Sequence, residues 1–188
     1  MRRVLLIFAL AVLVGAGVLF LLGRGRLGEV QRELRPAGAG PARLMTVRLY
    51  FGHPEHSGLV REDRVLLRGE RLEDRLRDCI RELAAGPLTG GVPAVPERTT
   101  LKRAFLDPWG LAWLDFNRGL LGRRSPGDYE EWLAVASLVR AVCDNFPEIR
   151  EIRIMVEGQV VVSLNGYIDL EEPLSSDDFP LMPVSGGF

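Results

Sequence analysis

The chain has few residues of the kinds that build covalent scaffolds and metal centres. It contains only 2 cysteines and 2 histidines among 188 residues. Two cysteines are too few for a disulfide framework or a thiolate metal site. A formal net charge of −1 argues against nucleic acid as a partner. The sequence also has no glycine-rich phosphate loop between a strand and a helix, and no internal repeat.

The cysteines and histidines that are present each allow two interpretations. Cys79 and Cys143 fall on apolar faces of expected helices, so we expect buried free thiols. A disulfide between two adjacent helices is the alternative, which an extracytoplasmic location would permit. His53 and His56 flank Pro54-Glu55 in an expected loop, and the chain has no third histidine for a metal. We therefore expect a solvated loop, with no metal and no cofactor.

A long apolar run stands at the start of the chain. Residues 4–22 carry no charge, and as a helix they would span about 28 Å, close to the roughly 30 Å hydrocarbon core of a bilayer. Secretory signals have shorter apolar regions and a small-x-small cleavage site after them. No convincing site of that kind follows the run, and no cysteine follows it for lipoprotein processing. We predict a retained transmembrane anchor, with a cleaved signal as the alternative.

The remaining chain has room for one ordinary domain. Arg2 and Arg3 favour a cytoplasmic N-terminus and hence an extracytoplasmic domain, although the arginines after the run pull the other way. Residues 23–43 are rich in proline, glycine and charge, which is typical of a flexible linker. We expect the folded domain over residues 44–174 and a loose C-terminal tail over residues 175–188.

Strand and helix patterns alternate along the folded part. Strands are expected at residues 47–51 and 65–67, and hairpins at 101–116 and 152–164. One amphipathic helix follows from the spacing of Leu72, Leu76, Ile80 and Leu83 and is ended by Gly86-Pro87. A second opens at Ser125-Pro126-Gly127-Asp128 and runs to Cys143. Two such helices can cover only one face of the sheet, so we predict an α+β two-layer sandwich, with both helices packed on one face of a small mixed sheet.

Few side chains suggest a functional site. Asp107-Pro108-Trp109-Gly110 has the residue preferences of a type I turn, which places Trp109 at an exposed hairpin tip. Trp109 is therefore the interaction candidate, because aromatic residues are common in binding hot spots; an exposed tryptophan without a role is the alternative. Trp113 and Trp132 are expected in the core. Asp107, Asp115 and Asp169 could serve as acid or base, but carboxylates at strand ends more often cap turns.

Several short segments together resemble a known family. They are Val47-Arg48-Leu49-Tyr50-Phe51, the Leu83-Ala84-Ala85-Gly86-Pro87 helix end, Val95-Pro96-Glu97-Arg98-Thr99-Thr100-Leu101, Ala112-Trp113-Leu114-Asp115-Phe116, Val156-Glu157-Gly158-Gln159 and Ser163-Leu164-Asn165-Gly166-Tyr167-Ile168-Asp169-Leu170 with Glu171-Glu172-Pro173-Leu174. In this order and spacing the chain resembles the GerMN domain family, named after the spore germination protein GerM. Arg98 stands where the family usually has glycine.

The resemblance implies a fold similar to the ring-building motifs of secretion-system rings. It also implies an extracytoplasmic domain linked to sporulation or spore germination. GerM-like proteins carry two such domains on a lipid anchor, whereas this chain has one domain and an apolar segment. We therefore expect a single-pass membrane protein whose domain is a protein-interaction module for envelope or sporulation proteins, or for cell-wall material, and not an enzyme. The alternative is an envelope enzyme acting on peptidoglycan or spore cortex through the strand-end aspartates.

Overall fold

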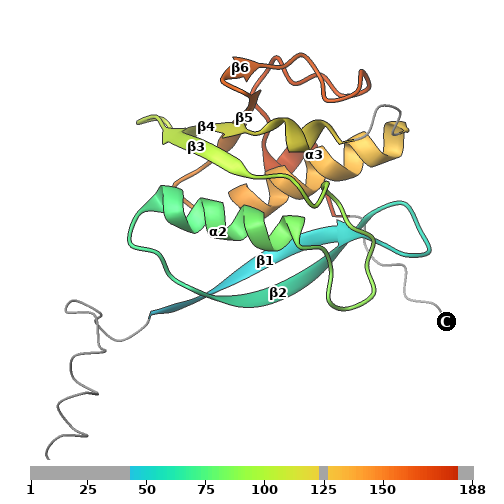
Figure 1. Ribbon diagram of the computed structural model, residues 1–188, viewed down its shortest axis with the longest axis horizontal. Helices are drawn as coiled ribbons and strands as arrows, with labels where there is room; N and C mark the ends of the chain where they lie inside the picture. The colour runs from blue at the N-terminus through green and yellow to red at the C-terminus, as the bar shows by residue number, and fades with distance from the viewer. Residues whose placement is uncertain (1–42, 123–126, 182–188) are drawn as a thin grey trace, which may run out of the picture. The chain divides into compact units, whose positions relative to one another are not determined.

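The computed structural model describes residues 43–122 and 127–181 (Figure 1). The predicted anchor over 4–22 and nearly all of the linker over 23–43 lie outside this part, as does Ser125, the expected helix cap. Within the described residues, neither helix combines the length and the apolar character that a membrane crossing requires.

The strands form two separate sheets. β1 (Leu44–Gly52) and β2 (Leu59–Leu67) pair antiparallel as a two-stranded ribbon, called the ribbon below. The second sheet has the order β3-β4-β5-β6, built from β3 (Leu101–Leu106), β4 (Leu111–Phe116), β5 (Glu151–Val156) and β6 (Gln159–Val160). β4 and β5 are parallel and the other pairs are antiparallel, so this sheet is mixed as predicted.

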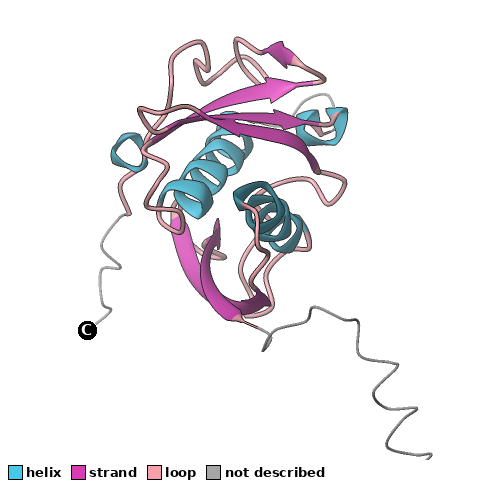
Figure 2. Ribbon diagram, turned by 90° about the vertical axis from the view of Figure 1, so that its left-hand side faces the viewer, coloured by secondary structure: helices cyan, strands magenta, loops and turns pink. Residues whose placement is uncertain are grey.

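Two α-helices lie between these sheets (Figure 2). α2 (Leu72–Ala84) and α3 (Asp128–Cys143) contact β3 and β5 on one side and β1 on the other. The α+β class and the placement of both helices on one face of a mixed sheet are confirmed. The two-layer description was wrong, because the ribbon is not part of that sheet and forms a third layer over the helices.

The third layer changes how α3 is buried. α2 buries one stripe that includes Leu76, Ile80 and Leu83, as an amphipathic helix should. In α3 every residue from Leu133 to Val139 is buried, because the ribbon and the sheet cover opposite sides of the helix. The core therefore centres on α3.

Side chains also tie the ribbon to the end of α3. The side-chain amide of Asn145 donates to the carbonyl of Arg48 and accepts from its N–H group, at 2.7 and 2.8 Å. The N–H and carbonyl groups of Gly52, at the far end of β1, pair with Val92. These contacts occupy the outer edge of β1 at Arg48 and Gly52, where it would otherwise be free to pair with another chain.

The chain remains packed beyond Leu174, which differs from the expectation of a loose segment from residue 175. Ser175 and Asp178 form a capping box on the short 3₁₀ helix η2 (Ser176–Asp178). The buried Phe179 ring then meets Trp132 of α3 edge-on, with 6.4 Å between centroids. Trp132 is partly buried against the core. Residues 182–188 lie outside the described part.

Candidate interaction surface

The β3–β4 turn presents Trp109 to solvent. Asp107 builds this turn by accepting hydrogen bonds from the N–H groups of Trp109 and Leu111, at 2.8 and 2.9 Å. Gly110 closes it with φ of 96°, in the left-handed region that favours glycine. Trp109 is 80% exposed, as expected for a hairpin tip. Asp107 thus has the turn-capping role expected of it, while contact by Trp109 stays a prediction.

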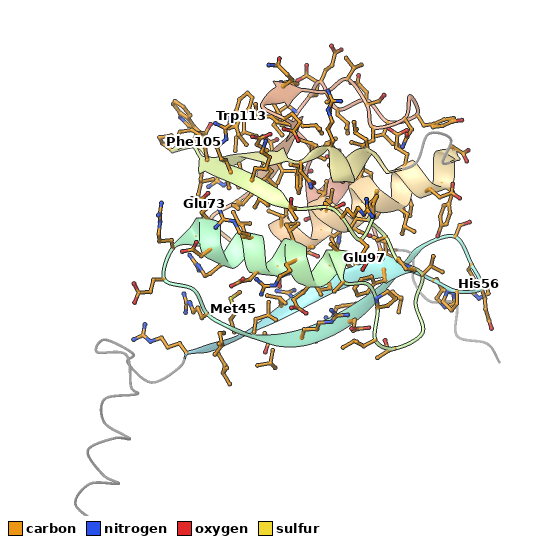
Figure 3. The ribbon with its side chains drawn as sticks, in the orientation of Figure 1. Met45, His56, Glu73, Glu97, Phe105 and Trp113 are labelled. Atoms are coloured by element: carbon orange, nitrogen blue, oxygen red, sulfur yellow. The ribbon has the colours of Figure 1, made fainter. Side chains whose placement is uncertain are left out.

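A second aromatic pair lies on the same hairpin. Phe105 of β3 and Trp113 of β4 are direct partners in the ladder, and residues so placed have Cβ atoms about 5 Å apart on one face. That face is opposite the helices (Figure 3) and is called the outer face. Trp113 was expected in the core, and this was wrong: it is only partly buried, because alternation turns Ala112 and Leu114 inward instead.

Arg153 fixes one side of this aromatic pair. It is the partner of Trp113 on the neighbouring strand β5, and its guanidinium lies over the indole, 5.2 Å from the ring centroid. Such a cation–π contact restricts the movement of the indole. Phe105 has no cover of this kind among the described residues and is 64% exposed. The outer face therefore offers a preformed aromatic platform on rigid strands.

The next row of the outer face is an ion pair. Asp115 is buried and accepts from Arg103 at 2.9 Å and from the N–H of Gly158 at 2.7 Å. Burial alone would raise the pKa of Asp115, but the hydrogen bonds from Gly158 and Arg103 outweigh it and hold the pKa below its ordinary value. An ionised, paired carboxylate is a weak base, and its contacts join β4 to the β5–β6 turn.

The other predicted groups are separate from this surface. Asp169 accepts from the N–H of Glu171 at 2.9 Å and so caps a local turn. His53 and His56 stack on each other in the β1–β2 loop, with 4.6 Å between centroids. Among the described residues no three His, Cys, Asp or Glu side chains are grouped closely enough to hold a metal ion. Cys79 and Cys143 are free thiols, so the disulfide alternative does not hold.

A groove of about 1020 Å³ runs beside the 3₁₀ helix η1 (Arg118–Leu121). Its wall includes Leu120, Ala134 and Leu164, and its carboxylates are Glu97 and Glu130. Both carboxylates are exposed. The amide of Asn117 is already bonded to Thr100 and Arg98. Neither Asp115 nor Asp169 lines the groove, so the carboxylates suggested for catalysis do not converge there.

Two buried charged groups were missed at the sequence level. Glu131, 1% exposed, accepts hydrogen bonds from the N–H groups of Leu164, Tyr167 and Ile168 and so organises the segment after β6. Its sequence signal was weak, because a glutamate in the first turn of a helix is ordinary on the surface.

The second missed group is an ion pair on β2. Arg64 donates to Glu62 at 2.7 Å and also reaches the carbonyls of Glu82 and Gly86. The other oxygen of Glu62 accepts from Leu88 and Thr89. This network holds the ribbon to the end of α2. The sequence signal was the order Arg61, Glu62, Asp63, Arg64. In a strand this order places Glu62 and Arg64 on the inward face and Arg61 and Asp63 on the outward face, so that each face has one ion pair.

The sequence matches the family model Germane, described as sporulation and spore germination, over residues 48–162. No curated protein is significantly similar in sequence.

Several solved structures are similar in fold. A Clostridium perfringens protein described as a lipoprotein has 22% identity and a TM-score of 0.50, over 77% of this chain and 96% of its own. The first GerMN domain of the Bacillus subtilis sporulation protein GerM has 17% identity and a TM-score of 0.57. This match covers 71% of the present chain and 99% of the GerMN domain structure. The tandem GerMN domains of the same protein have 20% identity and a TM-score of 0.57. This match covers 79% of the present chain but only 51% of the tandem structure. At these identities the likeness concerns the fold alone.

Proposed function

Because this chain belongs to the Germane family of sporulation and spore germination, we propose that it is a membrane-anchored, extracytoplasmic protein that acts by contact with envelope or sporulation proteins, without catalysis. The resemblance to the GerMN family seen in the sequence is confirmed by the family match and by the two GerM structures. The membrane anchor, the extracytoplasmic location and the action by contact are the parts that we propose.

The observation that carries the contact role is the aromatic outer face. Phe105 and Trp113 lie side by side on rigid strands, and Trp109 stands at the tip of the same hairpin. Aromatic residues near arginines are enriched where proteins bind proteins. A soluble monomer gains nothing from leaving such rings in water, since burying an aromatic side chain is among the larger favourable terms.

Two further observations support location and anchoring. The uncharged run of residues 4–22 is long enough to span a bilayer. The similar Clostridium perfringens protein is described as a lipoprotein, which is a membrane-anchored class. The two aspartates considered for catalysis also favour a role without catalysis. Asp115 is held in an ion pair, and Asp169 caps a turn.

The test is site-specific photo-crosslinking of the full chain in sporulating cells. Benzoylphenylalanine at position 105 should form a crosslink to a defined envelope or sporulation protein, identified by mass spectrometry. The same group at position 88 is the control, because Leu88 is 79% exposed, more than Phe105, but lies away from the outer face. Trp109→Ala should weaken the crosslink from position 105 without lowering the melting temperature. Identical products from positions 105 and 88, or none from 105, would remove the outer face from the proposal.

A further inference from the structure

The end of the ribbon where β1 starts and β2 finishes carries an exposed apolar patch. Leu44 pairs with Leu67, and Thr46 pairs with Val65, so their side chains share the face turned away from the helices. Leu44, Val65 and Leu67 are 64%, 64% and 66% exposed. Figure 1 shows this end at the lower left, where β1 begins. Cross-strand aliphatic pairs usually face a core, so a pair left in water requires a reason.

The patch does not continue along the ribbon. The next residues on the same face are Arg48 and its partner Asp63, followed by Arg61. Arg61 forms a two-point ion pair with Asp63, at 2.8 Å for each contact. Beyond the patch this face is therefore polar as far as Arg61, whose partner Tyr50 is buried.

Arginines stand at the tip of the ribbon, one residue beyond the apolar pair Leu44 and Leu67. Arg43 and Arg68 stand directly before β1 and after β2, and the N–H of Arg68 donates to the carbonyl of Arg43 at 2.7 Å. Arg71 follows with a side chain that is 76% exposed and pairs with Glu73 at 3.6 Å, so the positive charge left unpaired here among the described residues comes from Arg43 and Arg68. Glu70 is the exposed acidic residue of this turn, so positive charge is in excess. We call the surface formed by Arg43, Leu44, Val65, Leu67 and Arg68 the open end of the ribbon, or the open end.

We infer that the open end rests on the surface of an anionic phospholipid membrane. Aliphatic side chains flanked by arginines suit the boundary between headgroups and acyl chains, where arginine stems lie along apolar groups while their charges stay in water. Each basic residue near an anionic surface adds attraction. The inference rests on the proposed membrane anchor.

The geometry of the tether favours this contact. The predicted linker runs from residue 23 to the open end itself, and a flexible chain of that length has a mean span of about 25 Å. A tether of this reach gives an effective concentration in the millimolar range, so weak surface affinity is sufficient. A second copy of the chain is a poorer occupant, because three aliphatic side chains fall well short of the roughly 800 Å² per partner of a stable interface.

Hydroxyl-radical footprinting of the full chain would test the inference. The protein is placed at one copy per nanodisc, in phosphatidylcholine with or without phosphatidylglycerol, and compared with detergent micelles. Oxidation of Leu44 and Leu67 should fall by about threefold or more in the anionic discs, as expected for an end that is bound most of the time. Oxidation of Leu88 should not change.

Charge reversal gives the matched control. Arg43→Glu with Arg68→Glu should restore oxidation of Leu67 in anionic discs, whereas Arg98→Glu, an exposed arginine elsewhere on the domain, should not. Retention after a carbonate wash is measured on the native membranes of the same cells. If the chain is retained but Leu67 is oxidised as fast in anionic discs as in micelles, the inference fails and the anchor stands. If the chain is not retained, the proposed anchoring fails. Protection that appears only when discs hold several copies would assign the open end to a second chain and overturn the inference.

Discussion

At the residue scale, two buried carboxylates join distant segments of this domain. Glu131 and Glu62 are both removed from water, and each is compensated by several donors. A buried charge is tolerated only when its hydrogen bonds are satisfied. Each carboxylate also joins segments that are distant in sequence, so its removal should affect more than its own position.

Glu131→Gln is expected to destabilise the domain by about 1–3 kcal/mol. The amide keeps one oxygen but turns an NH₂ group toward backbone N–H donors, which leaves a buried polar group unsatisfied. Urea unfolding measures the loss, and hydrogen exchange should show faster opening at Leu164 and Tyr167. Glu130→Gln, the exposed neighbour, should change stability by less than about 0.5 kcal/mol. Equal effects at the two positions would contradict the assigned role.

Glu62→Gln should make stability less dependent on pH. Burial would raise the pKa of Glu62, but hydrogen bonds from Arg64, Leu88 and Thr89 lower it below its ordinary 4.5. A carboxyl with a depressed folded-state pKa stabilises the fold above its unfolded pKa, and this contribution is lost as the pH falls through the folded value.

The difference between the native protein and Glu62→Gln should therefore be largest at neutral pH, about 3 kcal/mol, and should shrink below pH of about 4.5. Urea midpoints from neutral to acidic pH measure it. Glu70→Gln, at an exposed position, serves as the control. A difference that stays constant into acid would show that the charge of Glu62 is not the stabilising feature.

At the element scale, the β3–β4 hairpin depends on its turn. Gly110 has φ of 96°, and a Cβ there would lie 3.1 Å from Cγ of Arg150. A residue with a side chain loses about 1–2 kcal/mol in a left-handed backbone conformation. Gly110→Ala should destabilise the domain by more than this, because the added Cβ would also crowd Arg150. Gly90→Ala is the matched variant, because Gly90 has φ of 88° and open space around it. Thermal unfolding should rank Gly110→Ala as the more harmful change.

Local signals predicted some elements well and others not at all. The limits of β3, β4 and α2 follow from alternation, a proline-glycine turn and the Gly86-Pro87 stop. β2 was missed before Val65, because Arg61 to Arg64 shows no apolar alternation; its inward members are an ion pair, whose burial depends on partners far along the chain. The third layer was missed although Leu133 to Val139 is apolar nearly all round, a pattern typical of a helix covered on two sides.

The outer face illustrates the same limit. The strand assignments alone place Phe105 and Trp113 on one hairpin, but the direction in which they point depends on which side the helices cover. Trp109 was found because its turn residues act locally through Asp107. The Phe105–Trp113–Arg153 row required the parallel pairing of β4 with β5, which no local pattern in the chain specifies.

At the scale of the whole molecule, the first question is whether residues 4–22 remain with the protein. We expect the full chain to stay in the membrane fraction after high-salt and carbonate washes, because the run matches the bilayer in length and no convincing cleavage site follows it. Immunoblotting of the washed membranes measures this. A shortened protein that begins near Arg24 would identify the run as a signal peptide.

The order in which the chain is synthesised has a consequence for how it folds. The ribbon leaves the ribosome before the rest of the domain. Its residues Tyr50 and Arg48 bond to Asp144 and Asn145, which follow 94 and 97 residues later. Contacts of such long range close late. α2 covers only part of the apolar inner face of the ribbon, so this face lacks most of its cover until α3 is complete, and the domain cannot close its core before then. A chain that ends before Asp128 should therefore lack cooperative unfolding in circular dichroism, and a cooperative transition in that fragment would show that the ribbon and α2 fold without α3.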